Sequence, residues 1–552
     1  MRKQGLAPVA TQSKSAKIKT SMNVAFNSLL ILGLDALPWR VLTPMMRAGH
    51  TPLLAALAAR GCSGNLRSTI PHQTPSAWTT FMTGVHPSTH GIVNWQHYDA
   101  RENAMTMNNV ERFAGKTIYE RLSAAGLKIG IVLQPGCYPP FEVNGYLLSG
   151  MDAPGVKSRF ASPREIEREI LEICPEHECN IDIDKKWDLE GHDADDGVFC
   201  RNIAVLNEHV QRVTRLALEL NRRHPSDVLM VYFQDPDLLL HRAWRWCDPE
   251  TWSANEIRRD AVAGFFKTLD AACGELIDGT KIDGAERLTL VLSDHGQRPD
   301  EKRVRLNSIL IELGFLTPEP SVNPVTKIFR RFASKLEERG QQGLGLAVDW
   351  KRTRAFMPFQ SCTGFIYVNL EGRQPHGSVK VEDFEKVRDE LIAALRAYRD
   401  PSSGENYFEE VAAMDAAHGW KKELLLPDIY VQPKAGIEFV RRAKVGEISF
   451  PTKRAYAGLH DPDGLYILDG AGVARSDSTH AHIVDLAPTL LAALNQPVPS
   501  YMEGRVLNEC FTQPLQVRTL PFEWDAKTAG EAYTEEGAAA VEKRLADLGY
   551  LD

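Results

Sequence analysis

The 552-residue sequence lacks any apolar stretch long enough to cross a membrane as a helix. The early run AFNSLLILGL is far shorter than the ~20 residues that a spanning helix needs. It follows the basic, acid-free segment MRKQGLAPVATQSKSAKIKTSMN, and the two together imitate a signal peptide. We reject that interpretation because the run ends at Asp35, a residue that the mature protein is expected to use. Residues 1–24 are therefore predicted to be a disordered basic tail.

The sequence also lacks any pattern of paired cysteines. Its nine cysteines are odd in number and scattered, and no two of them form a CxxC pair. Neither a disulfide framework nor a zinc site built from thiolates is expected from such spacing. The cysteine usage instead favours a reducing, cytoplasmic location.

An excess of positive charge is missing as well. The chain has 64 Lys and Arg against 72 Asp and Glu, a formal net charge of -8, which argues against nucleic acid as a partner. Hydrophobic residues at 43% and charged residues at 25% are typical of a soluble globular enzyme. At this length we expect one large domain with insertions, or two to four domains.

What the sequence does contain is a series of short runs rich in Val, Ile and Leu, each followed by a turn and a helical pattern. This alternation is typical of an α/β protein with a mainly parallel central sheet flanked by helices. Helices are predicted over 162–173, with Ser162 as N-cap and Pro163 in the first turn, and over 210–223. Strands are predicted at 28–34, 128–133, 145–150, 227–233, 287–293 and 465–470.

Two segments interrupt the alternation of strands and helices, and they divide the predicted α/β core into three parts. The α/β core is predicted over 25–155, 226–316 and 426–512, and a C-terminal tail helix over 513–552. A helical insertion is expected over 156–225, with the polar loop DLEGHDADDG, and a second insertion or cap over 317–425. The second one opens with the Pro-rich linker TPEPSVNP and the basic helix TKIFRRFASKLEERG, which we interpret as a solvated amphipathic helix.

Acidic and histidine side chains follow three of the predicted strands. Asp35 follows the first, Asp237 the fourth, and Asp294 and His295 the fifth, and ligands bind at the carboxyl ends of strands in such sheets. His241 stands four residues after Asp237, so the two share one face if a helix begins there. A lone Asp after a strand is usually a helix cap. The repeated Asp and His pattern instead favours divalent ions such as zinc, manganese or iron, and suits two of them.

The order of these motifs resembles the metal-site motifs of the alkaline phosphatase superfamily, in its type I phosphodiesterase/nucleotide pyrophosphatase branch. The resemblance runs from about residue 28 to 507, through ILGLDA, IPHQTPSAWTTFMTGVHPSTHGI, DPDLLLH, SDHG and GLHDPDG. Further stretches, such as PGCYPPFEVNGYLLSG and VDLAPTLLAALNQPVPSYMEGRVL, are similar to a bacterial and archaeal subgroup of predicted phosphohydrolases or phosphomutases.

The resemblance implies a ligand set and a nucleophile. The first metal ion is expected on Asp237, His241 and His460, and the second on Asp35, Asp294, His295 and the hydroxyl of Thr74. Zinc is the expected metal, with manganese or iron as alternatives. Thr74 would be the nucleophile, because coordination to a divalent cation lowers the pKa of a hydroxyl enough to form an alkoxide, and a phosphothreonine intermediate would follow.

One position departs from the family pattern. The phosphodiesterase branch commonly has an asparagine three residues after the threonine, to hold a nonbridging phosphate oxygen, and this chain has Ala77. Another group must then serve, or the substrate differs. We interpret Asn94 and Lys116 as surface residues outside the catalytic set, and Trp78 and Trp95 as buried against the sheet.

The substrate class follows from further absences. No Cys-x-Pro-x-Arg motif is present, which excludes the sulfatase branch. No Arg or Lys lies between Arg67 and Arg101, and a dianionic monoester usually asks for such a clamp. A phosphodiester or nucleotide-like pyrophosphate is therefore predicted, with the insertions roofing a pocket for the second substituent. A clamp from Arg354 or Arg373 would favour a phosphomonoesterase or phosphomutase instead, and a non-catalytic phosphoester-binding protein is the remaining alternative.

Overall fold

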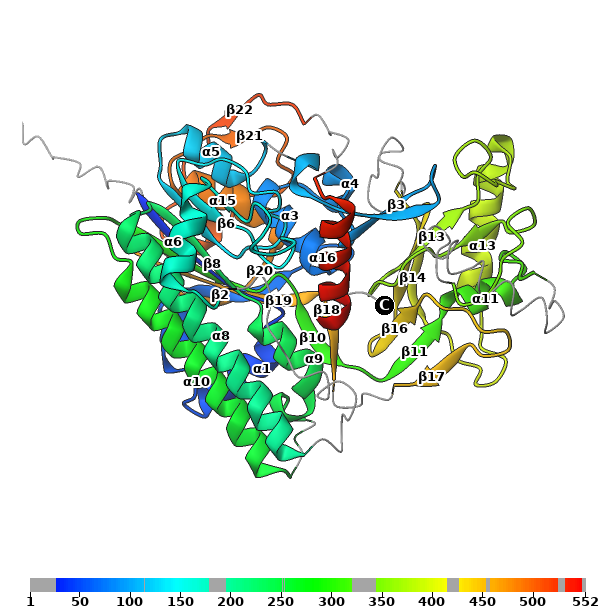
Figure 1. Ribbon diagram of the computed structural model, residues 1–552, viewed down its shortest axis with the longest axis horizontal. Coiled ribbons are helices and arrows are strands. Elements are labelled where there is room, and N and C mark those ends of the chain that lie inside the picture. Colours follow the sequence, from blue (N-terminus) through cyan, green and yellow to red (C-terminus); the bar gives the residue numbers. More distant parts are fainter. Residues whose placement is uncertain are drawn as a thin grey trace, which may run out of the picture.

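The computed structural model describes residues 26–113, 115–177, 195–250, 252, 254–319, 344–414, 426–452, 457–524 and 532–548. The predicted basic tail, the basic helix at 326–340 and most of the polar loop at 188–197 lie outside these residues. The described part has a larger and a smaller body, each with its own hydrophobic core, and the smaller body lies at the right in Figure 1.

The larger body is built on a nine-stranded sheet in which β19 is antiparallel to β2 and β9, β7 is antiparallel to β6, and the other neighbouring pairs are parallel. All six predicted strands are present, with boundaries within two residues of those expected, and the α/β fold class is confirmed. In spatial order the strands are β20 (Ser476–His482), β2 (Cys62–Arg67), β19 (Asp463–Asp469), β9 (Arg287–Leu292), β1 (Ser28–Leu34), β8 (Val228–Phe233), β5 (Ile129–Val132), β6 (Gly145–Leu148) and β7 (Ala161–Ser162).

Helices cover both faces of this sheet (Figure 1). One layer contains α2 (Pro52–Arg60), α6 (Glu165–Ile173), α8 (Asp196–Arg223), α9 (Asp235–Cys247) and α10 (Glu256–Gly279). The other contains α3 (Thr74–Thr83), α5 (Ile118–Ala124) and α15 (Leu486–Ala493). Further helices are α1 (Trp39–Arg47), α4 (Pro87–His90) and α16 (Glu535–Leu548). Among the described residues, no helix is long and apolar enough to span a membrane.

The two predicted helices are both present, but the predicted start of one is wrong: Ser162 is not its N-cap, and Pro163 precedes its first turn. The segment 210–223 forms the second half of α8. The segment 162–173 contains α6, which begins at Glu165 with Arg164 at the N-cap. Ser162 cannot cap this helix because it belongs to β7, where it pairs with Leu147 of β6.

The smaller body packs a four-stranded sheet and a three-stranded sheet around its own core. Tyr98, from the hairpin of β3 (Gln96–Asp99) and β4 (Ala104–Met107), enters this core and meets Phe356 and Tyr367 edge-on. The first sheet contains β12 (Ala355–Phe356), β13 (Gly364–Val368), β15 (Ile429–Pro433) and β14 (Phe408–Ala413). The second contains β16 (Ile437–Val440), β11 (Lys302–Arg305) and β17 (Ser449–Pro451), and α11 (Leu306–Glu312) and α13 (Phe384–Ala397) complete the body.

Candidate metal centre and active site

Three adjacent strands deliver the acidic side chains of the site. The central strand β1 pairs in parallel with β8 on one side and β9 on the other, so the carboxyl ends of all three lie at one edge. Asp35 directly follows β1, and Asp294 and His295 follow β9 after one residue. Helix α9 begins two residues after β8 and carries Asp237 and His241 one turn apart, as the sequence spacing predicts.

His460 arrives from a separate strand. It lies in β18 (Gly458–Asp461), which pairs antiparallel with β10 (Gly296–Pro299), and Gln297 is its direct partner across the ladder. Because β10 starts at the residue after His295, this pairing brings the two histidine rings together. They stack with centroids 3.9 Å apart.

Thr74 is the first residue of α3, and the packing of this helix fixes its position. Trp78, one turn later, is buried with its ring against β1, where a Cβ added to Gly33 would lie 2.7 Å from it. The helix ends at Gly84 in the left-handed conformation (φ 70°), a backbone state that glycine adopts without strain. Thr74 is itself fully buried, and its Oγ1 lies 3.3 Å from His295 Nε2.

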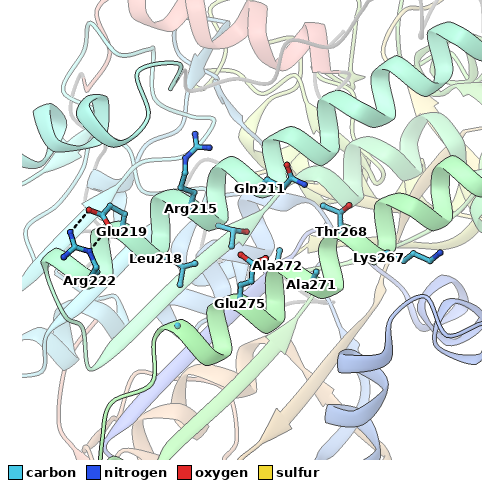
Figure 2. Close-up of a pocket in the computed structure, with 12 residues that line it drawn as sticks. Gln211, Arg215, Leu218, Glu219, Arg222, Lys267, Thr268, Ala271, Ala272 and Glu275 are labelled. Carbon is cyan, nitrogen blue, oxygen red and sulfur yellow. Dashed lines mark hydrogen bonds and ion pairs between the residues drawn. The ribbon is translucent and has the colours of Figure 1, made fainter.

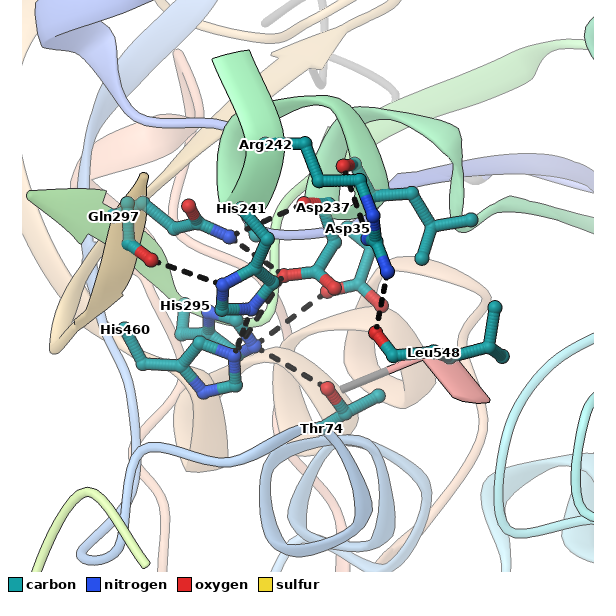
Figure 3. A network of polar contacts seen from close by, with 12 residues as sticks. Asp35, Thr74, Asp237, His241, Arg242, His295, Gln297, His460 and Leu548 are labelled. Atoms are coloured by element: carbon teal, nitrogen blue, oxygen red, sulfur yellow. Dashed lines mark hydrogen bonds and ion pairs between the residues drawn. The ribbon is translucent and has the colours of Figure 1, made fainter. Parts of the chain in front are cut away.

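The seven predicted residues therefore meet at one point. Figure 3 labels all of them except Asp294. One group of converging ligand atoms comes from Asp237, His295 and His460, and His241 joins it with Nε2 3.2 Å from Asp237 Oδ1 and 2.9 Å from His460 Nε2. A second group comes from Asp35, Asp294 and His295, with His295 Nε2 3.5 Å from each carboxylate.

The three histidines share one orientation. In each ring Nδ1 faces a backbone carbonyl, so Nδ1 must carry the proton and donate it: His241 to Gly458 at 2.9 Å, His295 to Gly296 at 3.0 Å, and His460 to His72 at 3.2 Å. The Nε2 atoms are left with their lone pairs toward the centre of the site. This arrangement is typical of metal-binding histidines, in which the outer nitrogen is held by a hydrogen bond.

A hydrogen bond also holds each of the three carboxylates, and in each case one carboxylate oxygen accepts it. Tyr232 donates its hydroxyl to Asp35 Oδ2, the Ala36 N–H donates to Asp294 Oδ1 at 3.3 Å, and Gln297 Nε2 donates to Asp237 Oδ1 at 2.7 Å. Among the described residues, Asp35 Oδ1 and Asp294 Oδ2 are buried without a hydrogen-bond partner. Buried oxygens of this kind are costly unless an ion or another group meets them.

Electrostatics also calls for cations at this point. Burial, followed by the charges of Asp294 and Asp237, raises the pKa of Asp35 well above its usual value, and burial raises the pKa of Asp294. Burial lowers the pKa of His460 well below its usual value, and the neighbouring histidines add to this. Burial opposes the charged form of His241, but the charge and the hydrogen bond of Asp237 outweigh it and raise the pKa of this histidine. Buried carboxylates that repel one another, together with the imidazole nitrogens beside them, form a donor set of the kind that binds zinc, manganese or iron.

Two residues interpreted as surface residues are in fact buried. Asn94 is 1% exposed. Its Nδ2 donates to the Gln360 carbonyl at 3.0 Å, and its Oδ1 accepts the Trp95 N–H at 2.7 Å. Lys116 is 5% exposed, with its ammonium 5.3 Å from the Trp524 ring centroid. Both lie in the packing around the hairpin and the C-terminal segment, which the local sequence does not reveal. The predicted burial of Trp78 and Trp95 is confirmed.

Neither arginine considered as a clamp reaches the site. Arg354 pairs with Glu390 at 3.1 Å and lies over the Phe315 ring, and Arg373 is held by Asp428 at 2.8 Å inside the smaller body. Arg298 of β10 does line the cleft beside His241 and His460, and its Nε is 3.0 Å from Asp461.

A cleft opens from the histidines toward the smaller body. Its inner wall is formed by His241, His460 and Gln73, and Arg298 lies beside them. The facing wall comes from the smaller body and includes Gln360, Ser361, Gln432 and Glu438. Gln73, the residue before Thr74, donates to Ser361 across the cleft at 3.2 Å. The two bodies thus enclose a polar cleft next to Thr74.

A larger surface groove lies elsewhere, between α8 and α10 (Figure 2). It is lined by Thr214, Arg215, Arg222, Lys267 and Glu275, and contains none of the seven predicted site residues. These segments of α8 and α10 run toward the amino ends of β8 and β9, whereas the metal centre lies at the carboxyl ends. The groove has no part in the chemistry described here.

Sequence reasoning missed several supporting residues. Gln297 and Tyr232 hold the carboxylates, and Arg242 links the site to the end of α16 through the Leu548 carbonyl at 3.1 Å (Figure 3). Tyr232 was within reach of the sequence, because it lies in a predicted strand just before Asp237. Gln297 and Arg242 depend on contacts between distant segments, and no local signal indicates them.

Comparisons with known proteins identify the family of the chain and proteins that share its fold. Residues 29–463 match the type I phosphodiesterase/nucleotide pyrophosphatase family. Human ectonucleotide pyrophosphatase/phosphodiesterase 5 superposes with a TM-score of 0.50 at 13% identity, covering 88% of this chain and 100% of its own. Phosphonoacetate hydrolase from Sinorhizobium meliloti 1021, in complex with phosphonoformate, gives 0.47 at 15% identity, covering 85% and 96%. A comparison with curated protein sequences found no match. The chain therefore belongs to the type I phosphodiesterase/nucleotide pyrophosphatase family of the alkaline phosphatase superfamily, and is a metal-dependent phosphoric ester hydrolase.

Proposed function

We propose that the protein is a two-metal phosphodiesterase that acts through a phosphothreonine intermediate on Thr74. The observation that carries this proposal is the shared orientation of His241, His295 and His460, whose Nε2 atoms face the same point as the buried carboxylates. Six Asp and His side chains and a hydroxyl are more ligands than one tetrahedral ion uses.

The ligands divide into two sets. Asp237, His241 and His460 would hold one ion, and Asp35, Asp294, His295 and Thr74 the other. Zinc is the metal we propose, since imidazole and carboxylate together suit it. Such ions, when bound, would lower the pKa of the Thr74 hydroxyl and neutralise charge on the phosphoryl oxygens.

The chain itself positions the reacting atoms. Thr74 Oγ1 would attack phosphorus in line with the departing alcohol, and water would then hydrolyse the phosphothreonine. Thr74 lies at the amino end of α3, where first-turn N–H groups such as that of Ser76 have no acceptor within the helix. The positive end of this helix favours an anionic phosphoryl group. We propose that it replaces part of what an asparagine at Ala77 would supply.

The cleft between the two bodies supports a diester as substrate. Its wall from the smaller body offers the amides and hydroxyl of Gln360, Gln432 and Ser361 to a second, polar substituent. A simple monoester has only one organic substituent, the leaving group, and so has no second substituent to place against this wall. Arg298 is the feature that favours the alternative, a phosphomonoesterase or phosphomutase, because it lines the cleft beside His241 and His460 and a guanidinium there would favour a dianion.

Paired substrates test this proposal. Second-order rate constants for bis-p-nitrophenyl phosphate and p-nitrophenyl phosphate would be compared under one metal condition, with a p-nitrophenyl sulfate control. We expect the diester to react faster and the sulfate not to react. A monoester preference of tenfold or more, about 1.4 kcal/mol in transition-state binding, would overturn the diester assignment and favour the phosphatase or mutase.

A further inference from the structure

Two cysteines from distant parts of the chain lie in direct contact inside the larger body. Cys62 Sγ is 2.8 Å from Cys510 Sγ, and both side chains are fully buried free thiols. For comparison, the sulfur atoms of Cys137 and Met82, which also touch in the core, are 3.7 Å apart. The two thiols are thus much closer than an ordinary packing contact between sulfur atoms in this molecule.

The backbone on both sides holds the pair in place. Cys62 is the first residue of β2, between β19 and β20, and Cys510 ends a short 3-10 helix (Asn508–Cys510). Ala474 N–H donates to the Cys510 carbonyl at 2.9 Å, and Ser476 N–H donates to the Gly61 carbonyl at 3.1 Å. One short stretch, 474–476, therefore fixes the chain beside both cysteines.

Hydroxyl groups surround the sulfur atoms. Tyr466 OH lies 3.5 Å from Cys510 Sγ, and Thr479 Oγ1 lies 3.6 Å from Cys62 Sγ. The hydrogen bond between the two thiols is the main cause that lowers the pKa of Cys62 to about 7, and the two hydroxyls add to it. The same hydrogen bond is the main cause that raises the pKa of Cys510. By contrast, burial raises the pKa of the Cys273 thiol. The lowered pKa of Cys62 depends on Cys510 lying beside it, so the contact of the two sulfur atoms, and not the pKa of either thiol, is what favours formation of a bond between them.

We propose that Cys62 and Cys510 form a disulfide bond in the folded protein when a low-molecular-weight disulfide is present as oxidant. The Cys62 thiolate attacks one sulfur of that molecule, breaks its S–S bond and releases one thiolate. The Cys510 thiolate then attacks Cys62 Sγ and releases the second. The two cysteines are oxidised, the small disulfide is reduced to two thiols, and these take up the two protons. Because both sulfurs are buried, the exchange occurs while the segment around Cys510 is undocked.

The bond would fasten a segment that braces the nucleophile helix. Glu503, shortly before Cys510, accepts the His86 N–H and the Thr89 hydroxyl at 2.6 Å each, and its own N–H donates to Gly84 at the end of α3. Cys62 itself lies at the amino end of β2, away from Thr74, which follows its carboxyl end. The expected effect is on stability and not on the chemical step, and it does not depend on the proposed function.

Thiol mapping of the full-length protein tests this inference. The protein is incubated with oxidised glutathione, denatured in N-ethylmaleimide without reductant, digested and analysed by mass spectrometry. We expect one linked pair of peptides that contains Cys62 and Cys510, with the other cysteines alkylated. We also expect dithiothreitol to lower the melting temperature by a few degrees.

Variants separate this bond from general effects of reductant. Cys510→Ser should abolish the dithiothreitol-dependent shift, whereas Cys273→Ser, a matched change at another buried cysteine, should retain it. Alkylation of both Cys62 and Cys510 after oxidation, or linkage of either one to a different cysteine, would overturn the proposal. If the variants fail to fold, the peptide map of the unsubstituted protein still decides it.

Discussion

At the level of single residues, Thr74 differs from the threonines that follow it in α3. Thr80 Oγ1 contacts His90 at 3.0 Å and Thr83 Oγ1 donates to the Thr79 carbonyl at 2.7 Å, so these hydroxyls support the helix. Thr74 Oγ1 instead lies 3.3 Å from His295 Nε2, in the candidate metal centre. The hydroxyl-rich stretch thus combines one hydroxyl at the candidate site with others that support the helix.

Replacement of Thr74 should separate chemistry from metal binding. Thr74→Ala should reduce turnover by at least about a thousandfold, because the attacking atom is lost, while Asp237, His241 and His460 keep their ion. Thr74→Ser should retain measurable turnover, and Thr83→Ala should behave as the unsubstituted enzyme. Steady-state kinetics with metal analysis of each variant checks this. A near-normal rate for Thr74→Ala would mean that water attacks directly, and the covalent mechanism would be wrong.

The sequence predicts residues well where a local pattern carries them. Asp35, Asp237 and Asp294 are visible because each follows an apolar strand whose end lies at the ligand-binding edge of the sheet. His460 was available only through resemblance to a family, since the polar segment around it has no strand-like pattern. Asn94 and Lys116 were misjudged because polar side chains usually lie at the surface, and here tertiary contacts bury them.

At the level of elements, the pairing of β10 with β18 completes the site. It sets His460 opposite Gln297, and Gln297 in turn holds Asp237. The long apolar strands were predictable because burial on both faces leaves a continuous hydrophobic run. This short polar ladder was not, because its two strands are far apart in the chain and only the folded core brings them together.

Removal of the Gln297 amide should weaken metal binding without removing a ligand. Gln297→Leu should lower metal affinity or activity by about 10–100-fold, as expected for a group that orients a ligand. Excess metal should restore part of the activity. Gln374→Leu, the same change at a buried glutamine in the smaller body, is the control and should leave affinity unchanged. Metal titration of the chelated proteins measures this, and equal affinities in the two variants would contradict the assigned role.

At the level of the whole molecule, the smaller body supplies one wall of the cleft next to Thr74. Gln360, Ser361, Gln432 and Glu438 make up that wall, and the body that carries them has its own hydrophobic core. The sequence indicated an additional region, but not that Tyr98 from the early part of the chain would enter its core. Such interleaving depends on which distant surfaces fit together, and hydrophobic periodicity contains no information about it.

The cleft predicts a substrate-binding role for Arg298. Arg298→Gln should raise KM for bis-p-nitrophenyl phosphate several-fold and leave the metal content unchanged, since its guanidinium lies in the cleft but is not a ligand. Arg67→Gln is a matched control, because Arg67 pairs with Asp463 at 2.9 Å nearby, outside the cleft lining. Michaelis–Menten kinetics of both variants checks this. A change confined to kcat, or the same change in both, would exclude the role.

Metal content tests the central claim most directly. Fully active protein should contain two divalent ions per chain, Asp294→Ala should lose the ion that Asp35 and His295 share with it, and exhaustive chelation should abolish turnover until metal is returned. Elemental analysis of the purified protein, with turnover measured on the same samples, decides the matter. The predicted result is two ions per chain in the active protein, with metal content and turnover lost together on chelation and restored together when metal is returned. At most one ion per chain in a fully active sample, or full turnover after chelation, would contradict the two-metal account.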